Sequence, residues 1–474
     1  MPQVLQADDT TFEVEVPLVV VGAGAAGLIA ALAAREAGVE VLVLERDAVP
    51  QGSTALSAGL IPAAGTAIQR AAGIVDDPAR FAADIAAKAE GLADPALVAL
   101  VTGAVAPAVD WLHARFGLPF TVITDFRYPG HDAHRMHGLP SRSGAALIDA
   151  LRSAAEGAGI DILCEARVTT LLVDAGQRVR GVVYARPDGT TERVGCRALL
   201  LACNGYGGNK ALVEAHIPAL ADALYFGHPG NQGEALRWGE ALGAARRDLS
   251  GHQGHGSVAE PGGILITWAT ITEGGLQVNA RGERFSDEAH GYSEQAAAVL
   301  AQPGRFAWTV FDRRIAAIAR QFEDFRQAEA AGLVIEAADA ATLAARMRVP
   351  ADALAATLQE VAALEAAGAR DAFGRDFAGV RPLTAPFCAV RVTGALFHTQ
   401  GGLVVDAATH VRLESGASLP NLLAAGGAAA GVSGPHASGY LSGNGLLTAV
   451  ALGWLAGREG ARLAAADGAL PEHG

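Results

Sequence analysis

Three glycines near the N-terminus have the spacing of a phosphate-binding turn. They lie in Gly22-Ala-Gly24-Ala-Ala-Gly27, directly after an apolar run and directly before a helical pattern. Gly22 allows a tight turn, Gly24 lets the backbone approach a pyrophosphate, and Gly27 lets helix and strand pack closely. The first helical residues, Ala25 and Ala26, then offer free N–H groups to the phosphates. The spacing predicts dinucleotide binding.

An acidic residue stands where a dinucleotide fold places a ribose. Glu45 ends the second apolar run, where a carboxylate accepts from ribose hydroxyls, and Arg46 follows it. The pattern alone leaves NAD and FAD open. A second such glycine triad is absent from the sequence, since Gly205-Tyr-Gly207-Gly208 lacks the third glycine. A reductase with separate FAD and nicotinamide domains is therefore disfavoured.

The glycine turn needs strands and a helix to position it. Residues 14–21 are expected to form a strand, a helix then runs to about residue 38, and a second strand covers 39–44. Continuous apolar strands beside such a helix indicate a parallel sheet that is covered on both faces. The uncharged stretch 17–34 is also about long enough to cross a bilayer, but its glycines and its LVVV start favour strand, turn and helix.

The rest of the chain mixes helical and alternating patterns. Helices are expected over 75–116, 311–366 and 446–458, and strands over 160–202, 402–406 and 421–427, with hairpin turns at 174–177 and 187–189. The segment 416–457 carries no charged side chain. Something must cover so long an uncharged, glycine-rich segment, and a large flat cofactor would do so.

Length and composition limit the class of protein. At 474 residues two domains are expected, and with 18% charged residues the chain is apolar enough to fold. A net charge of −14 argues against nucleic acid or an anionic membrane as partner. The four cysteines form no CxxC pair, so no metal site or dithiol is expected, and the first twelve residues do not read as a signal peptide. These features favour the cytoplasm.

Several further segments resemble the fumarate reductase / succinate dehydrogenase flavoprotein family, which also contains the 3-ketosteroid Δ1-dehydrogenases. They follow the family's order over nearly the whole chain. The resembling segments are 52–54, 57–59, 63–66, 201–209, 230–233, 275–279, 282–288, 398–402, 423–426 and 442–444. The resemblance implies an α/β fold, in which a Rossmann-type FAD-binding domain (1–249 and 398–474) carries an inserted α+β capping domain (250–397).

The resemblance also implies FAD in an extended pose. The residues implied to contact it are Gly22, Gly24, Ala25, Ala26, Gly27, Glu45, Arg46, Ser53, Thr54, Ser57, Ala58, Gly59, Val168, Ala202, Asn204, Gly205, Gly426, Ser442, Gly443, Asn444 and Leu446. Membrane-bound members attach the flavin covalently to a histidine where this chain has Ser53 and Thr54, so the FAD is expected to be non-covalent. Many members carry Gly-Glu where this chain has Gly426 and Gly427, which removes one expected ribityl contact.

The family's catalytic positions differ here in a specific way. Fumarate reductases use one arginine to deliver a proton and a second arginine to hold a substrate carboxylate. Matching this chain to the family's segments places Tyr292 and Tyr440 at those two positions. The family's substrate-side histidines are matched by His398 and by His255, although His252 is an equal neighbour of His255.

Replacing two guanidinium groups by two phenols changes the expected substrate. An arginine fork matches a carboxylate in charge and shape, and a phenol does not. A tyrosine hydroxyl can instead donate to a ketone oxygen, and a second tyrosine can accept the proton from the carbon α to that ketone. This pattern resembles the 3-ketosteroid Δ1-dehydrogenases. It predicts α,β-desaturation of a ketone, with Tyr292 as base, Tyr440 as carbonyl donor, and His398 and His255 positioning the substrate.

Two other functions stay open at this point. The same hydride step run backward would make the chain a C=C reductase for an enoate, fumarate or urocanate-like acid. The chain could also be a flavoprotein subunit that relays electrons to a partner. All three readings require a small-molecule substrate or an electron acceptor, and none requires nucleic acid.

Overall fold

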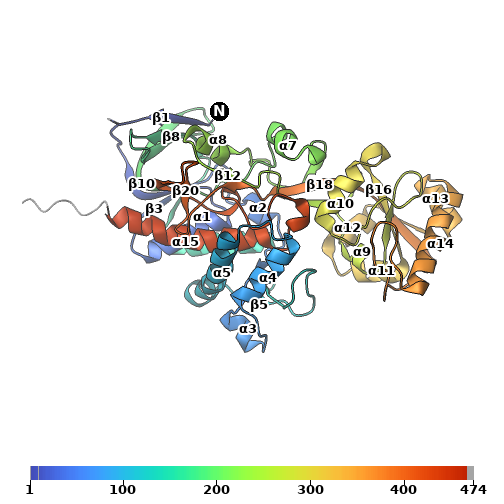
Figure 1. The fold of residues 1–474 in the computed structure, drawn as a ribbon. Helices are drawn as coiled ribbons and strands as arrows, with labels where there is room; N and C mark the ends of the chain where they lie inside the picture. The colour runs from blue at the N-terminus through green and yellow to red at the C-terminus, as the bar shows by residue number, and fades with distance from the viewer. Residues whose placement is uncertain (1, 9, 467–474) are drawn as a thin grey trace, which may run out of the picture. The chain divides into compact units, whose positions relative to one another are not determined.

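The computed structural model describes residues 2–8 and 10–466, which form two compact units (Figure 1). Unit 1 comprises the described residues of Met1–Leu212, Gly227–His252 and Thr399–Gly474, and unit 2 comprises Val213–Phe226 and Gln253–His398. Unit 2 includes the short stretch 213–226, which lies within the range predicted for the first part of the FAD-binding domain (1–249). The reason is that β11 (Leu224–Tyr225) pairs with β18 (Phe387–Thr399).

Unit 1 is built around a mixed sheet. Its strand order is β1-β8-β9-β10-β2-β3-β7, with β21 beside β10 and β20 beside β21. The bounds are β1 (Gln3–Gln6), β2 (Glu15–Val21), β3 (Val41–Leu44), β7 (Asp161–Leu163), β8 (Arg167–Val173), β9 (Val179–Ala185), β10 (Thr191–Leu201), β20 (His410–Arg412) and β21 (Ser418–Ala424). Strands β10, β2, β3 and β7 run parallel to one another.

The first strand–helix–strand unit is confirmed. Strand β2 leads through the glycine turn into α1 (Ala25–Glu36), and β3 pairs with β2 in parallel. The turns at 174–177 and 187–189 connect antiparallel strands, β8 to β9 and β9 to β10, as the alternating pattern predicts. The sequence therefore predicts both the parallel core of this sheet and its antiparallel extension.

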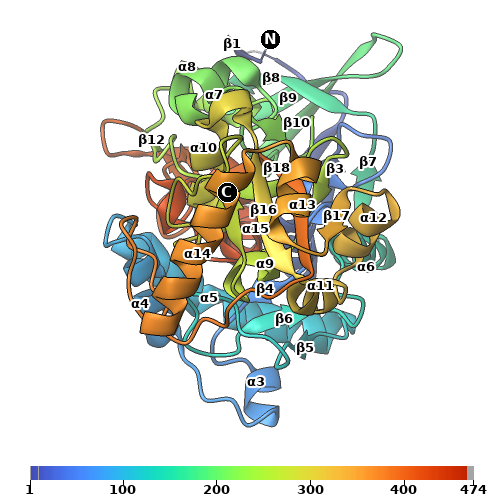
Figure 2. The same ribbon diagram turned by 90° about the vertical axis from the view of Figure 1, so that its right-hand side faces the viewer.

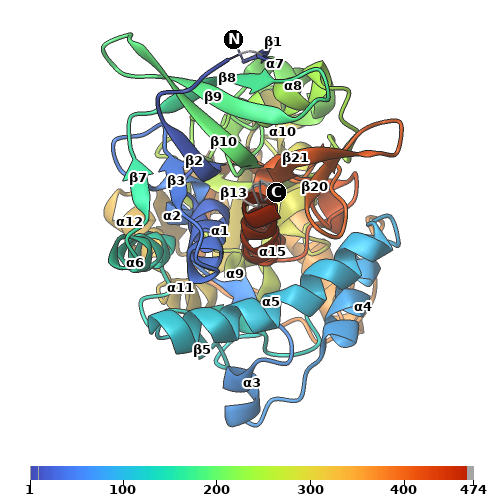
Figure 3. The ribbon, with the colours of Figure 1, turned by 90° about the vertical axis from the view of Figure 1, so that its left-hand side faces the viewer.

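Two helices pack against each other at unusually short range. Figure 3 shows α1 beside α15 (Asn444–Ala466), with α5 (Pro95–Phe116) crossing below them. A side chain at Gly453 would place its Cβ 2.6 Å from the Ala26 oxygen, and one at Gly457 would place it 2.1 Å from the Ala30 oxygen. Only glycine permits so close an approach of two helix backbones. Helix α15 is longer than the predicted range 446–458.

Other helices of unit 1 flank this pair. Residues 75–116, predicted as helical, form α4 (Pro78–Lys88) and α5, separated by a short break. The remaining elements that carry site residues are α2 (Gly52–Ala55), α6 (Gly144–Gly157), α8 (Glu234–Ala241) and the small sheet β4 (Ile61–Pro62), β5 (Thr121–Val122) and β6 (Met136–Gly138). By length and composition alone, one described helix, α5, could cross a membrane, and 56% of its apolar window is buried inside the protein.

Unit 2 has its own sheet, of order β14-β13-β18-β16-β15, with β11 and β17 also on β18. Its strands are β13 (His252–Ala259), β14 (Ile264–Leu265), β15 (Leu276–Val278), β16 (Ala307–Asp312) and β17 (Val334–Ala337). Helices α9 (Ala269–Thr272), α10 (Tyr292–Leu300), α11 (Arg313–Ala319), α12 (Glu323–Ala330), α13 (Ala340–Met347) and α14 (Ala351–Ala367) surround it (Figure 2).

One predicted helix of unit 2 is partly wrong. The range 311–366 is alanine-rich, but it begins with the end of β16 and contains β17 between α12 and α13. Val334 and Ile335 are β-branched, follow Gly332, and pair with the central strand β18. Sheet pairing outweighs the helical propensity of the surrounding alanines. The predicted strand 402–406 is likewise shorter, since β19 covers only Gly402–Leu403.

Candidate active site

Close backbone contacts around the glycine turn in unit 1 leave no room for a side chain at Gly22 or Gly27. Gly22 has φ +105° and donates its N–H to the Leu44 oxygen at 2.8 Å. A Cβ at Gly22 would lie 2.6 Å from the Ala202 oxygen, and one at Gly27 would lie 1.9 Å from the Gly22 oxygen. These two glycines hold the turn against β10 and against α1, while Gly24 forms the N-cap of α1.

Two side chains fix the turn and the first residue of α1. The Glu45 carboxylate is buried and accepts from Ala23 N–H at 2.8 Å and from Asp47 N–H at 2.9 Å. Thr54 Oγ1 accepts from Ala25 N–H at 3.1 Å. A carboxylate has room for about four hydrogen bonds, so Glu45 can still accept from a ribose hydroxyl.

Ser53 lies at the centre of a small amide cluster. Its hydroxyl oxygen is 2.9 Å from the side-chain nitrogens of both Asn204 and Asn231. Asn204 has φ +67° and accepts from Gly205 N–H at 2.8 Å. A Cβ at Gly427 would lie 2.1 Å from Asn204 Oδ1. A side chain at position 427 would therefore require Asn204 to move.

The turn Ser57–Ala58–Gly59 is held by its own hydrogen bonds. Ser57 Oγ donates to the Thr54 oxygen at 2.7 Å and accepts from Gly59 N–H at 3.0 Å. Gly144, at the start of α6, packs so closely that a Cβ there would lie 2.0 Å from the Thr54 oxygen. Ala58 is exposed. The structure thus brings the predicted segment 53–59 to the start of α1.

Three predicted contacts lie at other edges of this region. Val168 is buried in β8. Two residues before it, Ala166 N–H donates to the backbone carbonyl oxygen of Glu45 at 2.8 Å. The Arg46 guanidinium donates to the Gly230 oxygen and lies 3.3 Å from the Glu234 carboxylate. Arg46 is therefore held by the 230–234 segment. Gly426 faces α1, since a Cβ added at this position would lie 3.1 Å from the Cβ of Ala26.

The start of α15 carries a buried amide side chain. Asn444 is fully buried, and its Nδ2 donates to Ser433 Oγ at 2.9 Å. Among the described residues, Asn444 Oδ1 is buried with no hydrogen-bond partner. Gly443 has φ +91° and lies against Pro62, while Leu446 is half-buried. The first N–H groups of a helix lack partners within the helix and attract negative charge.

Tyr440 is buried directly before this helix start. The backbone N–H groups of Gly443 and Gly445 and the phenol of Tyr128 lie in its surroundings. Burial raises the pKa of Tyr440 above its ordinary value, although the two N–H donors act in the opposite direction. The phenol therefore stays protonated near pH 7.

In unit 2, His255 lies within a group of aromatic rings. It stacks on Tyr292 at 5.1 Å and on Phe397 at 5.4 Å between ring centroids, and Trp268 meets it edge-on at 5.5 Å. Burial lowers the pKa of His255 to about 3, so the ring is neutral near pH 7. Its Nδ1 accepts from Ser257 N–H at 3.2 Å, so the proton sits on Nε2. His255 is a neutral hydrogen-bond donor.

The other predicted catalytic residues of unit 2 are placed by its elements. Tyr292 is the first residue of α10, and His398 is half-buried at the end of β18, next to Phe397. His252 belongs to unit 1, where its Nδ1 lies 2.7 Å from the Ser250 oxygen, whereas the His255 ring stacks on Tyr292 within unit 2. The structure therefore pairs Tyr292 with His255. Tyr440 belongs to unit 1.

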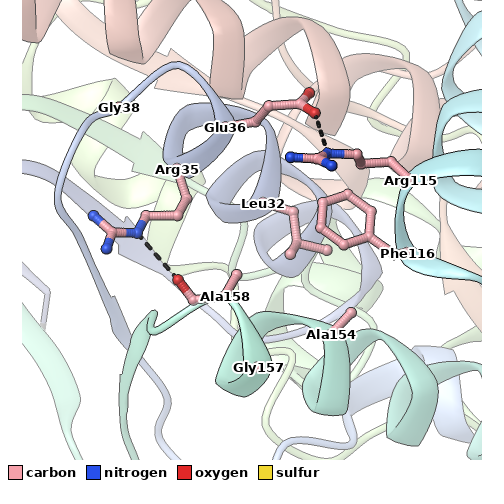
Figure 4. A pocket seen from close by; sticks show the side chains of 9 residues that line it. All are labelled: Leu32, Arg35, Glu36, Gly38, Arg115, Phe116, Ala154, Gly157 and Ala158. Carbon is pink, nitrogen blue, oxygen red and sulfur yellow. Dashed lines mark hydrogen bonds and ion pairs between the residues drawn. The ribbon is translucent and has the colours of Figure 1, made fainter.

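Sequence reasoning missed several residues of these clusters. Asn231 lies in the recognised 230–233 segment, and Phe397 adjoins His398, so both carried a signal. Trp268 and His131 carried none, since His131 reaches Ser442 across 311 positions of sequence. One surface pocket, bordered by Arg35, Glu36 and Arg115, lies at the far end of α1 from the glycine turn and contains no predicted site residue (Figure 4).

The residues of unit 1 fit a dinucleotide. The glycine turn places no side chain over the start of α1, and Glu45 is in place for a ribose. At the start of α15, Asn444 Oδ1 is buried without a hydrogen-bond partner among the described residues. Among the described residues, no group of three or more His, Cys, Asp or Glu side chains is arranged to hold a metal ion.

The comparisons with known proteins identify the family of the chain. Residues 18–446 match the model of a family described as FAD binding domain. The chain is 30% identical to a probable fumarate reductase, Ifc3, of Shewanella frigidimarina, over 94% of this chain and 74% of that protein. It is 26% identical to 4-oxocyclohexanecarboxylate 2-dehydrogenase of Sinomonas cyclohexanicum, over 93% of this chain and 92% of that one.

Two solved structures share the whole fold. The open conformation of a flavocytochrome c3 fumarate reductase has a TM-score of 0.82 at 29% identity, covering 96% of this chain and 79% of that one. The 3-ketosteroid-Δ4-(5α)-dehydrogenase of Rhodococcus jostii RHA1, in complex with 4-androstene-3,17-dione, has a TM-score of 0.76 at 25% identity, covering 97% and 99%. The chain belongs to the FAD-binding family that includes the fumarate reductases. It is an FAD-dependent oxidoreductase of the kind that acts on CH–CH and C=C bonds.

Proposed function

We propose that this protein desaturates a ketone between its α and β carbons. Bound FAD supplies the acceptor for the hydride that leaves the β carbon. Tyr292 accepts the proton from the α carbon, and Tyr440 donates its O–H to the ketone oxygen. His255 and His398 position the substrate. Atoms and electrons balance in this step. The β C–H bond leaves as a hydride with both of its electrons. The α C–H bond gives up only its proton, and its electron pair forms the new C=C bond.

The state of the Tyr440 hydroxyl carries this proposal. Tyr440 is buried and burial raises the pKa of its phenol, so the hydroxyl keeps its proton near pH 7 and is proposed to donate it to an uncharged oxygen. A donor of this kind stabilises the negative charge that develops on a ketone oxygen when the α proton leaves. It offers no positive charge to a carboxylate, which an arginine would.

The surroundings of Tyr292 support its role as base. Tyr292 is the first residue of α10, and its ring stacks on His255 at 5.1 Å between centroids. The stacked His255 ring is neutral, so no cation fixed there would bind a carboxylate. Two relatives with ketone-related names, the 4-oxocyclohexanecarboxylate and the ketosteroid dehydrogenases, cover nearly all of this chain and are nearly all covered by it.

The FAD is proposed to be held without a covalent bond. Ser53 Oγ is engaged by two asparagines and Thr54 Oγ1 by Ala25 N–H, and neither residue is a histidine. Acid precipitation of the purified protein should release the yellow colour into the supernatant. Colour that stays in the protein pellet would overturn this part of the proposal.

Tyr292→Phe tests the assignment of the base. The variant should bind a ketone substrate with similar affinity, while the flavin absorbance is lost at least about 100-fold more slowly on anaerobic mixing, the scale of general-base catalysis. Tyr184→Phe is a matched control, because that phenol pairs with Glu192 on the antiparallel part of the unit 1 sheet. Unchanged reduction kinetics in Tyr292→Phe would remove Tyr292 as the base.

The main alternative is reduction of a C=C bond in an unsaturated acid. The 30% identity to a probable fumarate reductase favours it. It predicts that dithionite-reduced protein is reoxidised by fumarate-type acids and that ketones do not bleach the oxidised protein. An electron-relay subunit, the third possibility, predicts poor turnover with artificial acceptors when the chain is alone.

A further inference from the structure

We infer that three buried side chains of unit 2 position the Tyr292 ring against His255. They are Ser293, Gln277 and Gln295, and they act as positioning residues rather than as groups that touch the substrate. The inference rests on the proposed function, in which Tyr292 is the base and His255 positions the substrate.

One hydrogen bond joins the neighbours of the two stacked rings. Ser293 directly follows Tyr292 at the start of α10, and Gly254 directly precedes His255 in β13. Ser293 Oγ accepts from Gly254 N–H at 2.9 Å. This bond therefore sets the distance between the helix start and the strand beside the stack.

An amide pair makes a second connection on the other side of His255. Gln277 Nε2 donates to the Gly256 oxygen at 2.9 Å, and Gln277 Oε1 accepts from Gln295 Nε2 at 2.8 Å. A carbonyl oxygen can only accept, so the contact with Gly256 fixes which end of the Gln277 amide faces β13. The strand is thus bonded to α10 one residue before His255 and, through Gln277, one residue after it.

Two glycines let α10 approach β13 closely enough for these bonds. A Cβ at Gly254 would lie 2.5 Å from the Ser293 oxygen, and one at Gly256 would lie 2.7 Å from the Gln295 carbonyl carbon. A side chain at either position would push the helix start away from the strand. The stack of His255 on Tyr292, at 5.1 Å between ring centroids, depends on this approach.

Further hydrogen bonds fix the direction of both amides. Gln277 and Gln295 are 1% and 2% exposed. Gln277 Nε2 also donates to Thr309 Oγ1 at 3.1 Å, and Gln295 Nε2 lies 2.8 Å from Ser286 Oγ. A buried amide is costly unless its bonds are made, and a bonded network fixes direction as well as distance. The first turn of α10 therefore has little freedom to rotate and carry Tyr292 away from His255.

Two substitutions break the two connections separately. Ser293→Ala removes the acceptor for Gly254 N–H, and Gln295→Met removes the donor to Gln277 at a similar side-chain length. Thermal unfolding shows whether each variant is folded. If Gln295→Met does not fold, Gln277→Met takes its place.

Thr357→Val and Gln302→Met are matched controls from the same unit. Thr357 Oγ1 donates to the Gly282 oxygen at 2.8 Å, and Gln302 Nε2 donates to the Ala298 oxygen at 3.1 Å, near the far end of α10. Neither bond connects α10 to β13. The controls therefore report the effect of a lost hydrogen bond on unit 2 without a change at the stack.

The first readout needs no substrate. Histidine labelled with carbon-13 at Cε1 gives one signal for each of the 13 histidines, and His255→Gln identifies that of His255 by its loss. A ring proton held against aromatic faces is shielded, so Tyr292→Leu should move the His255 signal downfield. Ser293→Ala and Gln295→Met should move it in the same direction, while both controls should leave it in place. An unchanged His255 signal in Ser293→Ala and Gln295→Met would overturn the inference.

The second readout is a double-mutant cycle on flavin reduction by a ketone. Gln295→Met should slow reduction by roughly tenfold with little change in KM, since a misplacement of about 1 Å costs up to about 100-fold. In the Tyr292→Phe background the same change should have no further effect. No slowing in Gln295→Met, or equal slowing in both backgrounds, would overturn the inference. If Tyr292→Phe itself leaves reduction unchanged, the proposed function fails, while the His255 signal still decides whether the three side chains position the stack.

Discussion

Tyr440 and His255, two of the proposed catalytic side chains, are both buried and neutral. Tyr440 is buried, and His255 Nδ1 accepts from Ser257 N–H, so the His255 proton sits on Nε2. Neither residue carries a charge near pH 7, because burial raises the pKa of Tyr440 and lowers that of His255. Neutral donors of this kind suit a ketone oxygen better than a carboxylate.

Thr54 should matter for both stability and cofactor binding. Thr54→Val removes the acceptor for Ala25 N–H at the start of α1, and the loss of such a helix cap costs about 1 kcal/mol. Urea unfolding of the FAD-free protein and the FAD dissociation constant measure the two effects. Thr121→Val, an exposed threonine of β5, is the control and should change neither. Equal stability of Thr54→Val and the parent would contradict the capping role.

At the scale of elements, the contact between α1 and α15 holds two parts of the cofactor site in register. The start of α1 follows the glycine turn, and the start of α15 carries Ser442 to Leu446. The two helices lie as close as they do because Gly453 and Gly457 present no side chain to α1.

Gly457→Ala should therefore destabilise the protein. The added Cβ would lie 2.1 Å from the Ala30 oxygen, and overpacking of this kind costs about 1–3 kcal/mol. Gly103→Ala, in the interior of α5, meets nothing within 4 Å and should instead be neutral or slightly stabilising. The midpoints of thermal unfolding compare the two. A Gly457→Ala variant as stable as Gly103→Ala would show that the helices are free to separate.

The elements that the sequence predicts best are those with a local signal. The glycine triad after β2 and the hairpin turns at 174–177 and 187–189 are set by residues next to one another. Strand β17 was missed, because its pairing with β18 joins residues more than fifty positions apart. The His131–Ser442 bond was missed for the same reason, since nothing in the sequence near His131 refers to residue 442.

At the scale of the whole molecule, three buried histidines should make stability depend on pH. The pKa of His131 and of His137 is lowered to about 4 and that of His255 to about 3, all by burial. These values lie below the 6.5 of an exposed histidine, so the unfolded chain binds more protons between pH 6.5 and about 4. Their contribution is fully present above pH 6.5 and is lost as the pH falls.

Each of these histidines should add at most about 1.4 kcal/mol per pH unit to that loss. Unfolding free energies at pH 7, 6 and 5 measure it, and His137→Gln should show a smaller fall than the parent. His290→Gln is the control, because that side chain is 57% exposed and should leave the slope unchanged. If the parent protein became more stable as the pH fell from 6.5 to 5, the neutral, buried state of these histidines would be contradicted.

The central claim is that the protein removes hydrogen from a ketone, and one experiment tests it most directly. The oxidised yellow protein is mixed without oxygen with cyclic ketones, ketosteroids and saturated dicarboxylates, and the flavin absorbance is followed. The account predicts loss of absorbance with one or more ketones, formation of the matching enone, and no response to succinate. Bleaching by succinate, or reoxidation of the reduced protein by fumarate with no response to any ketone, would contradict it.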